Sequence, residues 1–291
     1  MAEAKENIRG ALIMMGSMAA FTFNDTFFKT VAGDVPLFQA IFIRGCMVSL
    51  VLFLYVSVQG QLRPPIERRD WRLLGVRSIG EVGATLAFLV ALFNAPIANV
   101  TAMLQAAPLV LTLAGALLLG EKVGWRRYTA IAVGFFGVLL IVQPTGSGFN
   151  PYTLYALIAL AFMLFRDLPT RRLSTKVPSV FVALLASVSI TVTGAVGLIF
   201  EEWVPLTIQN LKAIGGASAF LVFAYILAVS VMRVGDMAVV QPFRYTGILW
   251  AILLGMLVFG EIPNRLMLIG ATIVVAMGIY TFYREGKMRR T

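Results

Sequence analysis

Histidine is absent from this 291-residue chain, and cysteine occurs once, as Cys46. The missing histidines exclude His-ligated metal sites and histidine general bases, and a single cysteine excludes a disulfide within the chain. No G-x-x-x-x-G-K-[ST] segment is present, so the phosphate-binding loop of nucleotide hydrolases is missing too. The sequence therefore predicts no metal, no cofactor and no catalytic residue, and we do not expect an enzyme.

Charged residues are also scarce, at 13% of the chain, whereas hydrophobic residues make up 59%. A soluble domain of this length does not have that balance, so the composition predicts an all-α polytopic membrane protein that lies in a lipid bilayer. The formal net charge of +10 would suggest a nucleic-acid partner in a soluble protein, and its distribution must be considered first.

Ten apolar segments are long enough, or nearly so, to cross a bilayer, which requires roughly 20 residues. Gly, Pro and Asn residues separate them, as turns require. The predicted transmembrane helices are residues 8–29, 36–58, 71–92, 98–119, 125–142, 152–172, 178–200, 211–231, 238–259 and 264–283.

Lysine and arginine concentrate at the two termini and in alternate loops. The loops on the opposite side carry only Lys29, Lys212 and Arg265. Since positively charged loops stay in the cytoplasm, both termini are predicted to be cytoplasmic. The positive charge then sets the topology, and no nucleic-acid partner is needed to explain it.

An internal repeat relates the two halves of the sequence. The stretch Gln105–Glu121 matches the last part of Gln241–Glu261 at a constant offset of 140 residues, and both end in Gly-Glu, where glycine leaves a helix through left-handed dihedrals. Chance similarity between two leucine-rich helices is the alternative. Five spans are an odd number, so a second copy is inverted relative to the first. We therefore predict two inverted five-helix repeats, 1–146 and 147–291, around a central cavity.

Ionisable residues inside the spans are candidates for function, because a charge in hydrocarbon is costly. Asp25 precedes Lys29 by four residues, so these two either pair at a helix end or face the cavity. Arg44 lies eight residues inside its span, about 12 Å from the end at helical rise. We expect Arg44 to face a cavity and to contact a carboxylate or an anionic solute.

Two further groups of charges lie deeper in the chain. Arg77 and Glu81 are four residues apart, which allows either mutual neutralisation or contact with a solute. Arg166 and Asp167 lie nearer a helix end, and we expect a structural role there, with Asp167 paired to Arg171.

Polar residues also occupy related positions in the two repeats. Gln105 corresponds to Tyr245, which follows Arg244, and both are expected to line the central cavity. Pro108 and Pro242 are expected to kink their helices and free backbone carbonyls. The predicted solute-binding residues are Asn24, Asp25, Arg44, Glu81, Gln105, Arg244, Tyr245 and Trp250.

These motifs resemble the drug/metabolite transporter superfamily, in particular its EamA-type ten-helix carriers. The resemblance rests on the two Gly-Glu helix ends, each followed by a glycine-bearing closing helix. The segments Phe23-Asn24-Asp25, Phe42-Ile43-Arg44-Gly45 and Pro242-Phe243-Arg244-Tyr245 are similar to a subgroup that includes riboflavin importers and S-adenosylmethionine carriers. The resemblance to this superfamily implies alternating access around a central cavity and a location in the bacterial inner membrane.

The predicted function is secondary transport of a small organic metabolite, such as a vitamin like riboflavin, a nucleoside-like or an amino-acid-like solute. Export of amino acids or drugs by the same fold is one alternative, and a membrane enzyme that acts on lipid is another. Proton coupling through Asp25 or Glu81 and uncoupled diffusion are both open, as are a monomer and a homodimer.

Overall fold

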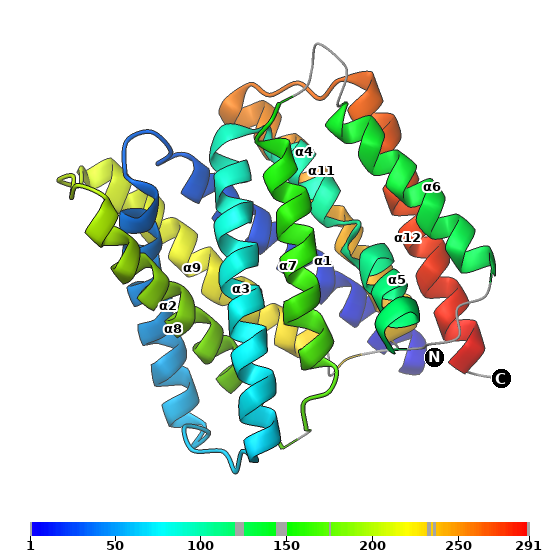
Figure 1. Cartoon of the computed structure of the whole chain (residues 1–291), viewed down its shortest axis with the longest axis horizontal. Coiled ribbons are helices and arrows are strands. Elements are labelled where there is room, and N and C mark those ends of the chain that lie inside the picture. Colours follow the sequence, from blue (N-terminus) through cyan, green and yellow to red (C-terminus); the bar gives the residue numbers. More distant parts are fainter. Residues whose placement is uncertain are drawn as a thin grey trace.

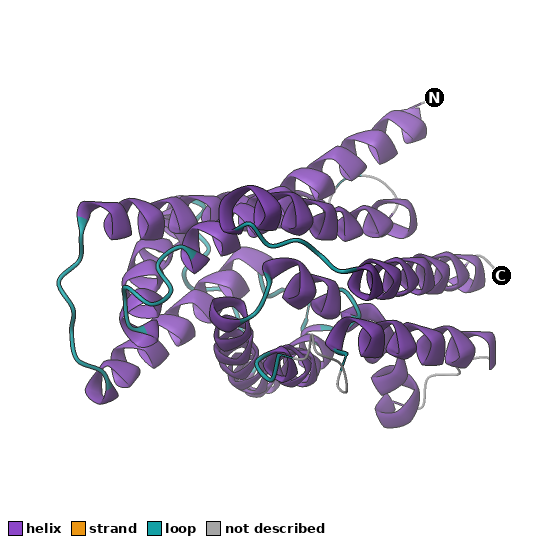
Figure 2. Cartoon of the chain, turned by 90° about the horizontal axis from the view of Figure 1, so that it is seen from above, coloured by secondary structure: helices purple, strands orange, loops and turns teal. Residues whose placement is uncertain are grey.

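The computed structural model describes residues 2–119, 125–143, 150–174, 176–231, 234 and 237–289. Within these residues all regular structure is helical and no strand occurs (Figure 2). The first half of the chain contains α1 (Ala2–Lys29), α2 (Leu37–Val58), α3 (Arg68–Asn94), α4 (Ile97–Leu104), α5 (Ala107–Leu119) and α6 (Trp125–Val142). The second half contains α7 (Thr153–Thr170), α8 (Ser179–Gly197), the 3-10 helix η1 (Leu198–Phe200), α9 (Ile208–Val231), α10 (Met237–Val240), the 3-10 helix η2 (Gln241–Tyr245), α11 (Thr246–Phe259) and α12 (Arg265–Arg289). The all-helical fold class is therefore confirmed.

Two of the expected spans are interrupted where the sequence places a proline. Helix α4 ends at Leu104, four residues before Pro108, and α5 then begins at Ala107. In the second half, α10 gives way to η2, which contains Pro242, before α11 begins. Proline lacks an N–H and clashes with the carbonyl four residues earlier, so both interruptions have the same cause.

Seven described stretches are long and apolar enough to cross a membrane: Leu37–Val58, Arg68–Asn94, Ile97–Leu117, Thr153–Thr170, Ser179–Phe200, Ile208–Ala228 and Gln241–Phe259. Two shorter apolar helices, Tyr128–Val142 and Arg265–Thr281, accompany them. Helix α1 belongs to neither group, and its last two turns carry Asn24, Asp25 and Lys29. The chain is therefore a multi-pass membrane protein, and the count of ten spans stays a prediction.

The most extensive helix contacts join one half of the chain to the other (Figure 1). Helix α1 packs along α9, α2 along α8, α3 along α7, and α6 along α12. If the two halves are inverted repeats, each helix has an equivalent in the other half. The α1–α9 contact is then equivalent to the α3–α7 contact, and the α2–α8 and α6–α12 contacts are each equivalent to themselves. The pairing agrees with the predicted repeat, which remains a prediction.

Glycines allow close approach at several of these helix contacts, as small residues do in membrane proteins. A Cβ at Gly45 of α2 would lie 3.0 Å from the Cα of Thr191 in α8. A Cβ at Gly137 of α6 would lie 2.9 Å from the carbonyl oxygen of Gly270 in α12, and one at Gly270 would lie 2.5 Å from that of Gly137. Backbone therefore meets backbone where α6 crosses α12.

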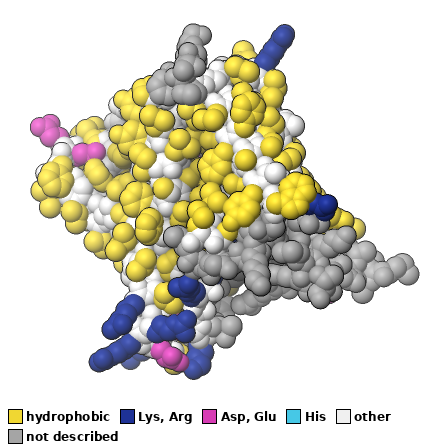
Figure 3. Space-filling model, turned by 45° about the vertical axis from the view of Figure 1, so that its right-hand side comes forward, with side chains coloured by type: hydrophobic (Ala, Val, Ile, Leu, Met, Phe, Trp, Pro, Cys, Tyr) yellow, Lys and Arg dark blue, Asp and Glu magenta, His cyan; other side chains and the backbone are white. Residues whose placement is uncertain are grey.

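One end of the bundle is basic. Figure 3 shows hydrophobic side chains over the middle of the visible face and Lys and Arg side chains gathered at its lower end. We call this the basic end and define it by exposed residues from the α2–α3 connection, the first turns of α3 and the α7–α8 connection: Arg63, Arg68, Arg69, Arg72, Arg171, Arg172 and Lys176. The apolar middle and charged end are what a bilayer and its aqueous border require.

A largely buried ion pair lies at the opposite end. The Lys29 Nζ of α1 lies 2.5 Å from Glu261 Oε1 and also donates to the Ala95 carbonyl at 2.6 Å. The other Glu261 oxygen accepts the Ile97 N–H at 2.8 Å. Glu261 follows Gly260, whose φ of 64° confirms the predicted left-handed helix end. Its counterpart Gly120-Glu121 lies outside the described residues.

We predict that Glu261→Gln lowers the free energy of unfolding by about 3 kcal/mol, because it leaves the Lys29 ammonium buried without a counter-charge. Thermal unfolding of the purified protein in detergent measures the loss. The matched control is Glu67→Gln, since Glu67 pairs with Lys176 on the surface with side chains 65% and 63% exposed. That change should stay within about 0.5 kcal/mol. Equal effects of the two variants would contradict the structural role of Glu261.

Candidate functional site

A cavity of about 330 Å³ lies at the centre of the bundle. Helices α1, α2, α3, α4, α7, α8 and α9 all contribute to its wall, together with η2 and the start of α11. The structure brings six of the eight predicted solute-binding residues to this wall: Asn24, Asp25, Arg44, Glu81, Gln105 and Arg244. Its size falls at the lower end of the range for small-molecule sites.

Arg44 faces the cavity from α2 with only 6% of its surface exposed. Its guanidinium carbon lies 3.9 Å from the ring centroid of Phe28, and its charge attracts that of Asp25 on α1. A buried arginine needs such a carboxylate and such a ring, because it has lost its hydration. Asp25 also accepts a hydrogen bond from Asn24 Nδ2 at 2.8 Å. Lys29 pairs with Glu261 instead, so the alternative of an Asp25–Lys29 pair is not found.

Two more ion pairs border the cavity. Arg77 and Glu81 of α3 lie 3.2 Å apart, which is the mutual neutralisation that their spacing allows, and Glu81 also reaches the cavity wall. Arg166 of α7 donates from Nε to Asp167 at 2.7 Å and lines the cavity as well. The purely structural role expected for Arg166 is therefore incomplete, because its side chain is also available to the cavity.

Gln105 connects the two interrupted helices. Its Nε2 donates to the carbonyl oxygen of Arg244 at 2.8 Å, across the cavity wall from the α4–α5 break to η2. Gly247 permits this approach, since a Cβ there would lie 3.2 Å from Gln105 Nε2. A carbonyl at the second break is thus satisfied by a side chain at the first, as membrane-embedded irregular backbone requires.

Tyr245 and Trp250 lie outside the cavity wall. Tyr245 is buried against α12, where a Cβ on Gly278 would overlap its phenol. The expectation that Tyr245 faces the same cavity as Gln105 is therefore not met. Trp250 lies 6.5 Å from the ring of Phe23, which stacks on Phe220 at 5.1 Å. These rings pack α1 against α9 and α11 rather than against the cavity.

Two cavity-lining side chains carry buried polar atoms that have no hydrogen-bond partner among the described residues. They are the Oδ1 of Asn24, an acceptor, and the Nε of Arg244, a donor. Buried polar groups in proteins are almost always paired, so unpaired ones need an explanation. A solute that offers one donor and one acceptor would satisfy both.

An apolar layer closes the cavity toward the Lys29–Glu261 pair. Its members are fully buried and come from α1, α2, α3, α4 and α9: Phe28, Ile41, Leu89, Leu92, Ile97 and Ile214. Leu89 belongs to both this layer and the cavity wall. The cavity is therefore separated from that end of the bundle by packed side chains and a buried ion pair.

Sequence reasoning missed Arg166 and Tyr225 as cavity residues. Arg166 could have been found, because the 140-residue offset of the repeat places it level with Thr26, beside Asp25. Tyr225 of α9 contacts Phe21 edge-on, with ring centroids 5.8 Å apart, and it interacts electrostatically with Glu81 and Arg44. No charge or breaker near Tyr225 marks it in the sequence.

Comparison with known proteins supports the resemblance stated above. The model of the EamA-like transporter family matches residues 8–143. The S-adenosylmethionine uptake transporter of Rickettsia prowazekii is 23% identical over 286 residues, covering 97% of this chain and 95% of that protein. The riboflavin transporter of Vibrio cholerae is 28% identical over 290 residues, covering 97% and 96%. The resemblance to this superfamily and subgroup is confirmed.

Two further comparisons widen this picture. The pseudopaline exporter of Pseudomonas aeruginosa is 24% identical over 277 residues, covering 90% of this chain and 93% of that protein. A known protein crystal structure superposes with a TM-score of 0.62 at 19% identity, covering 94% of this chain and 96% of that one. That likeness concerns the fold alone.

We predict that Gly278→Ala destabilises the protein by about 1–3 kcal/mol, because the added methyl group overlaps the phenol of Tyr245. Thermal unfolding in detergent measures the change. Gly75→Ala in α3 is the matched control, since nothing lies within 4 Å of its Cβ position. It should be neutral or stabilising by up to about 1 kcal/mol. A Gly278→Ala protein as stable as the unaltered chain would show that Tyr245 does not pack on α12.

Proposed function

We propose that this chain, a relative of the EamA-like transporters, is a secondary transporter that moves a small organic metabolite across a membrane by alternating access. The observation that carries the proposal is a central cavity within a multi-pass helical bundle, lined by buried charged groups. Ionisable side chains at such depth mark solute pathways in membrane proteins. The names of the relatives support transport rather than lipid chemistry.

The proposed solute carries an anionic or carbonyl group and a hydrogen-bond donor. Arg44 is close to Asp25, and Arg166 is paired with Asp167, whereas the Nε of Arg244 has no partner among the described residues. Arg244 would therefore hold the acceptor group of the solute, with Arg44 nearby, and Asn24 would accept from a donor. Phe21 and Phe88 on the wall would lie against a flat ring. A vitamin such as riboflavin or a nucleoside-like or amino-acid-like solute fits this description.

The proposed setting is the bacterial inner membrane, with the basic end and both termini in the cytoplasm. In this proposal residues 1–146 and 147–291 are the two inverted five-helix repeats, and the polar sites lie at their interface, as in other carriers of this plan. The contacts of α1 with α9 and of α3 with α7 support that arrangement.

Direction and energy coupling are separate questions. The Pseudomonas relative is named an exporter, and the Rickettsia relative an uptake transporter. If transport is proton-coupled, Asp25 and Glu81 are the titratable acids on the cavity wall. Flux into right-side-out and inside-out vesicles, with an imposed pH gradient and without one, distinguishes import from export and coupled from uncoupled transport.

A thermal-shift screen of the purified protein identifies the solute class. The panel should contain riboflavin, S-adenosylmethionine and amino acids, because a ligand at 100 times its Kd stabilises the folded state by about 2.7 kcal/mol. Solute flux into liposomes then tests transport directly. Turnover of a lipid substrate by the purified protein, with no solute flux, would favour the membrane enzyme instead.

We predict that Arg44→Ala abolishes flux of the solute that the screen identifies, while the protein still inserts into the membrane. The change removes the buried cation that would hold an anionic or carbonyl group of the solute, and it leaves Asp25 without its neighbouring positive charge. Flux into liposomes at matched protein content provides the measurement. Arg69→Ala at the exposed basic end is the control and should retain flux. Unaltered flux through the Arg44→Ala protein would remove Arg44 from the solute pathway.

A further inference from the structure

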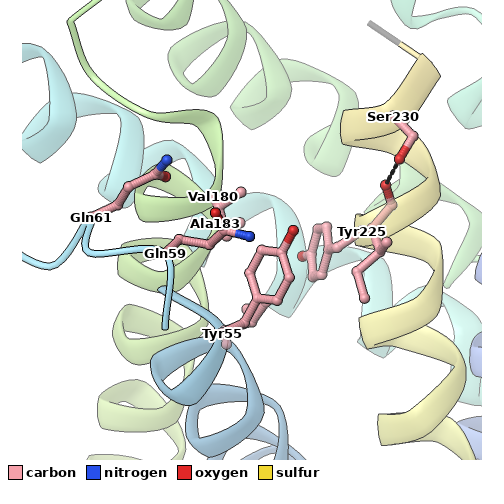
Figure 4. Close-up of a pocket in the computed structure, with 9 residues that line it drawn as sticks. Tyr55, Gln59, Gln61, Val180, Ala183, Tyr225 and Ser230 are labelled. Carbon is pink, nitrogen blue, oxygen red and sulfur yellow. Dashed lines mark hydrogen bonds between the residues drawn. The ribbon is translucent and has the colours of Figure 1, made fainter. Parts of the chain in front are cut away.

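A second pocket, of about 140 Å³, lies at the basic end of the bundle (Figure 4). It is formed by the end of α2, the beginning of α8 and the second half of α9. Its polar lining residues are Tyr55, Gln59, Gln61, Tyr225 and Ser230, and Ala183 is among the apolar ones. The two glutamines precede Arg63 of the basic end in the α2–α3 connection. Nothing in the fold or in the names of the relatives assigns a role to this pocket.

The pocket continues the central cavity along the same three helices. On α8, Ser187 lines the cavity and Ala183 lines the pocket. On α2 and α9 the lining residues are likewise four apart, with Val48 and Leu221 in the cavity wall and Leu52 and Tyr225 in the pocket wall. Four residues are about one helical turn, or about 6 Å along the axis. The two hollows are therefore stacked, with the smaller one toward the basic end.

Tyr225 stands between the two hollows. It is the one lining residue that they share among those described. On the cavity side its ring meets Phe21 edge-on, and its phenol interacts with the charges of Arg44, Glu81 and Arg166. On the other side it enters the pocket together with Tyr55, as Figure 4 shows. Rotation of one side chain would thus connect the two spaces, and rotamer changes are fast compared with helix movements.

We propose that this pocket is a transit site through which solute passes between the central cavity and the basic end, and that Tyr225 is the partition between them. The proposal rests on the transport function proposed above. The site would take the uncharged, hydrogen-bonding part of a polar organic solute, because its lining offers phenols and carboxamides and no charged side chain. Weaker binding there than in the charged cavity would allow the solute to leave.

Because the chain has a single native cysteine, the proposed passage can be tested by cysteine labelling without knowing the solute. Cys46 is exposed and is first replaced by Cys46→Ser. Ser187→Cys then places a thiol on the cavity wall, and Gln61→Cys in a separate protein marks the basic end. A charged, membrane-impermeant methanethiosulfonate reagent is applied to sealed right-side-out and inside-out vesicles, and the labelling rate is measured.

The Ser187→Cys thiol should be labelled from the same side as the Gln61→Cys thiol. Adding Ala183→Phe, which fills the pocket, should slow labelling by about tenfold or more, an added barrier of about 1.4 kcal/mol. Adding Tyr225→Ala should accelerate it by a similar factor. Ala195→Phe is the matched control, because Ala195 is exposed on the same helix outside both hollows, and it should leave the rate unchanged.

Equal rates for the Ala183→Phe and Ala195→Phe proteins would overturn the proposal, as would labelling of the Ser187→Cys thiol from the opposite side only. If Tyr225→Ala prevents folding, the labelling rates of the Ala183→Phe and Ala195→Phe proteins still test the proposal. Because the reagent is the probe, the result is independent of solute flux. The expected labelling pattern without any flux would reject transport and leave the passage standing, whereas flux with equal labelling rates would reject the passage alone.

Discussion

The ion pair between Lys29 and Glu261 closes one end of the bundle, and the arrangement of the helices around the cavity depends on it. The break between α3 and α4 leaves the Ala95 carbonyl and the Ile97 N–H without helical partners. Lys29 donates to the first, and Glu261 accepts from the second. In a low-dielectric setting each of these four groups would be costly alone, so together they hold α1, the α3–α4 junction and the end of α11 in one place. The apolar layer beneath them then separates the cavity from that end.

The same requirement for partners explains the chemistry of the cavity. Arg77 neutralises Glu81, Asp167 binds Arg166, and Arg44 lies over the ring of Phe28 and is attracted by the charge of Asp25. The fold thus satisfies most of its buried charges internally. On the cavity wall, the Asn24 Oδ1 and the Arg244 Nε have no hydrogen-bond partner among the described residues, and these are the atoms that a solute would bind. This division between structural and available groups cannot be seen from residue types alone.

The sequence predicted the helices well because their signals are local. Apolar runs gave most helix bounds to within three residues, whereas α1 begins six residues earlier and α12 ends six residues later than predicted. Pro108 and Pro242 marked the two interruptions, and Gly260 marked a left-handed helix end. Contacts between residues that are far apart in the chain could not be predicted from the sequence. Glu261 was recognised only as part of a Gly-Glu helix end, and its partner Lys29, 232 positions away, carries no signal of the pairing. Asp25 was weighed as a partner for Lys29 because only neighbours along a helix can be inferred from spacing.

The site residues show the same division. Asp25, Arg44 and Glu81 were found because charges within apolar runs are conspicuous, and the structure places all three on the cavity wall. Tyr245 was misplaced for a geometric reason. It lies in η2, where a 3-10 turn advances about 20° more per residue than an α-helix, or about 100° over five residues. An orientation extrapolated from α-helical spacing is therefore wrong there, and Tyr245 packs on α12 instead.

The crossing of α6 and α12 bears on how such a bundle can change shape. At Gly137 and Gly270 the two backbones are in direct contact, with no side chain between them. Two helices in such contact cannot alter their mutual angle without driving a carbonyl group into the opposite main chain. In a conformational cycle α6 and α12 would therefore move together as one rigid body. Any bending would occur in the interrupted helices α4–α5 and α10–α11, where the regular helical backbone is already broken.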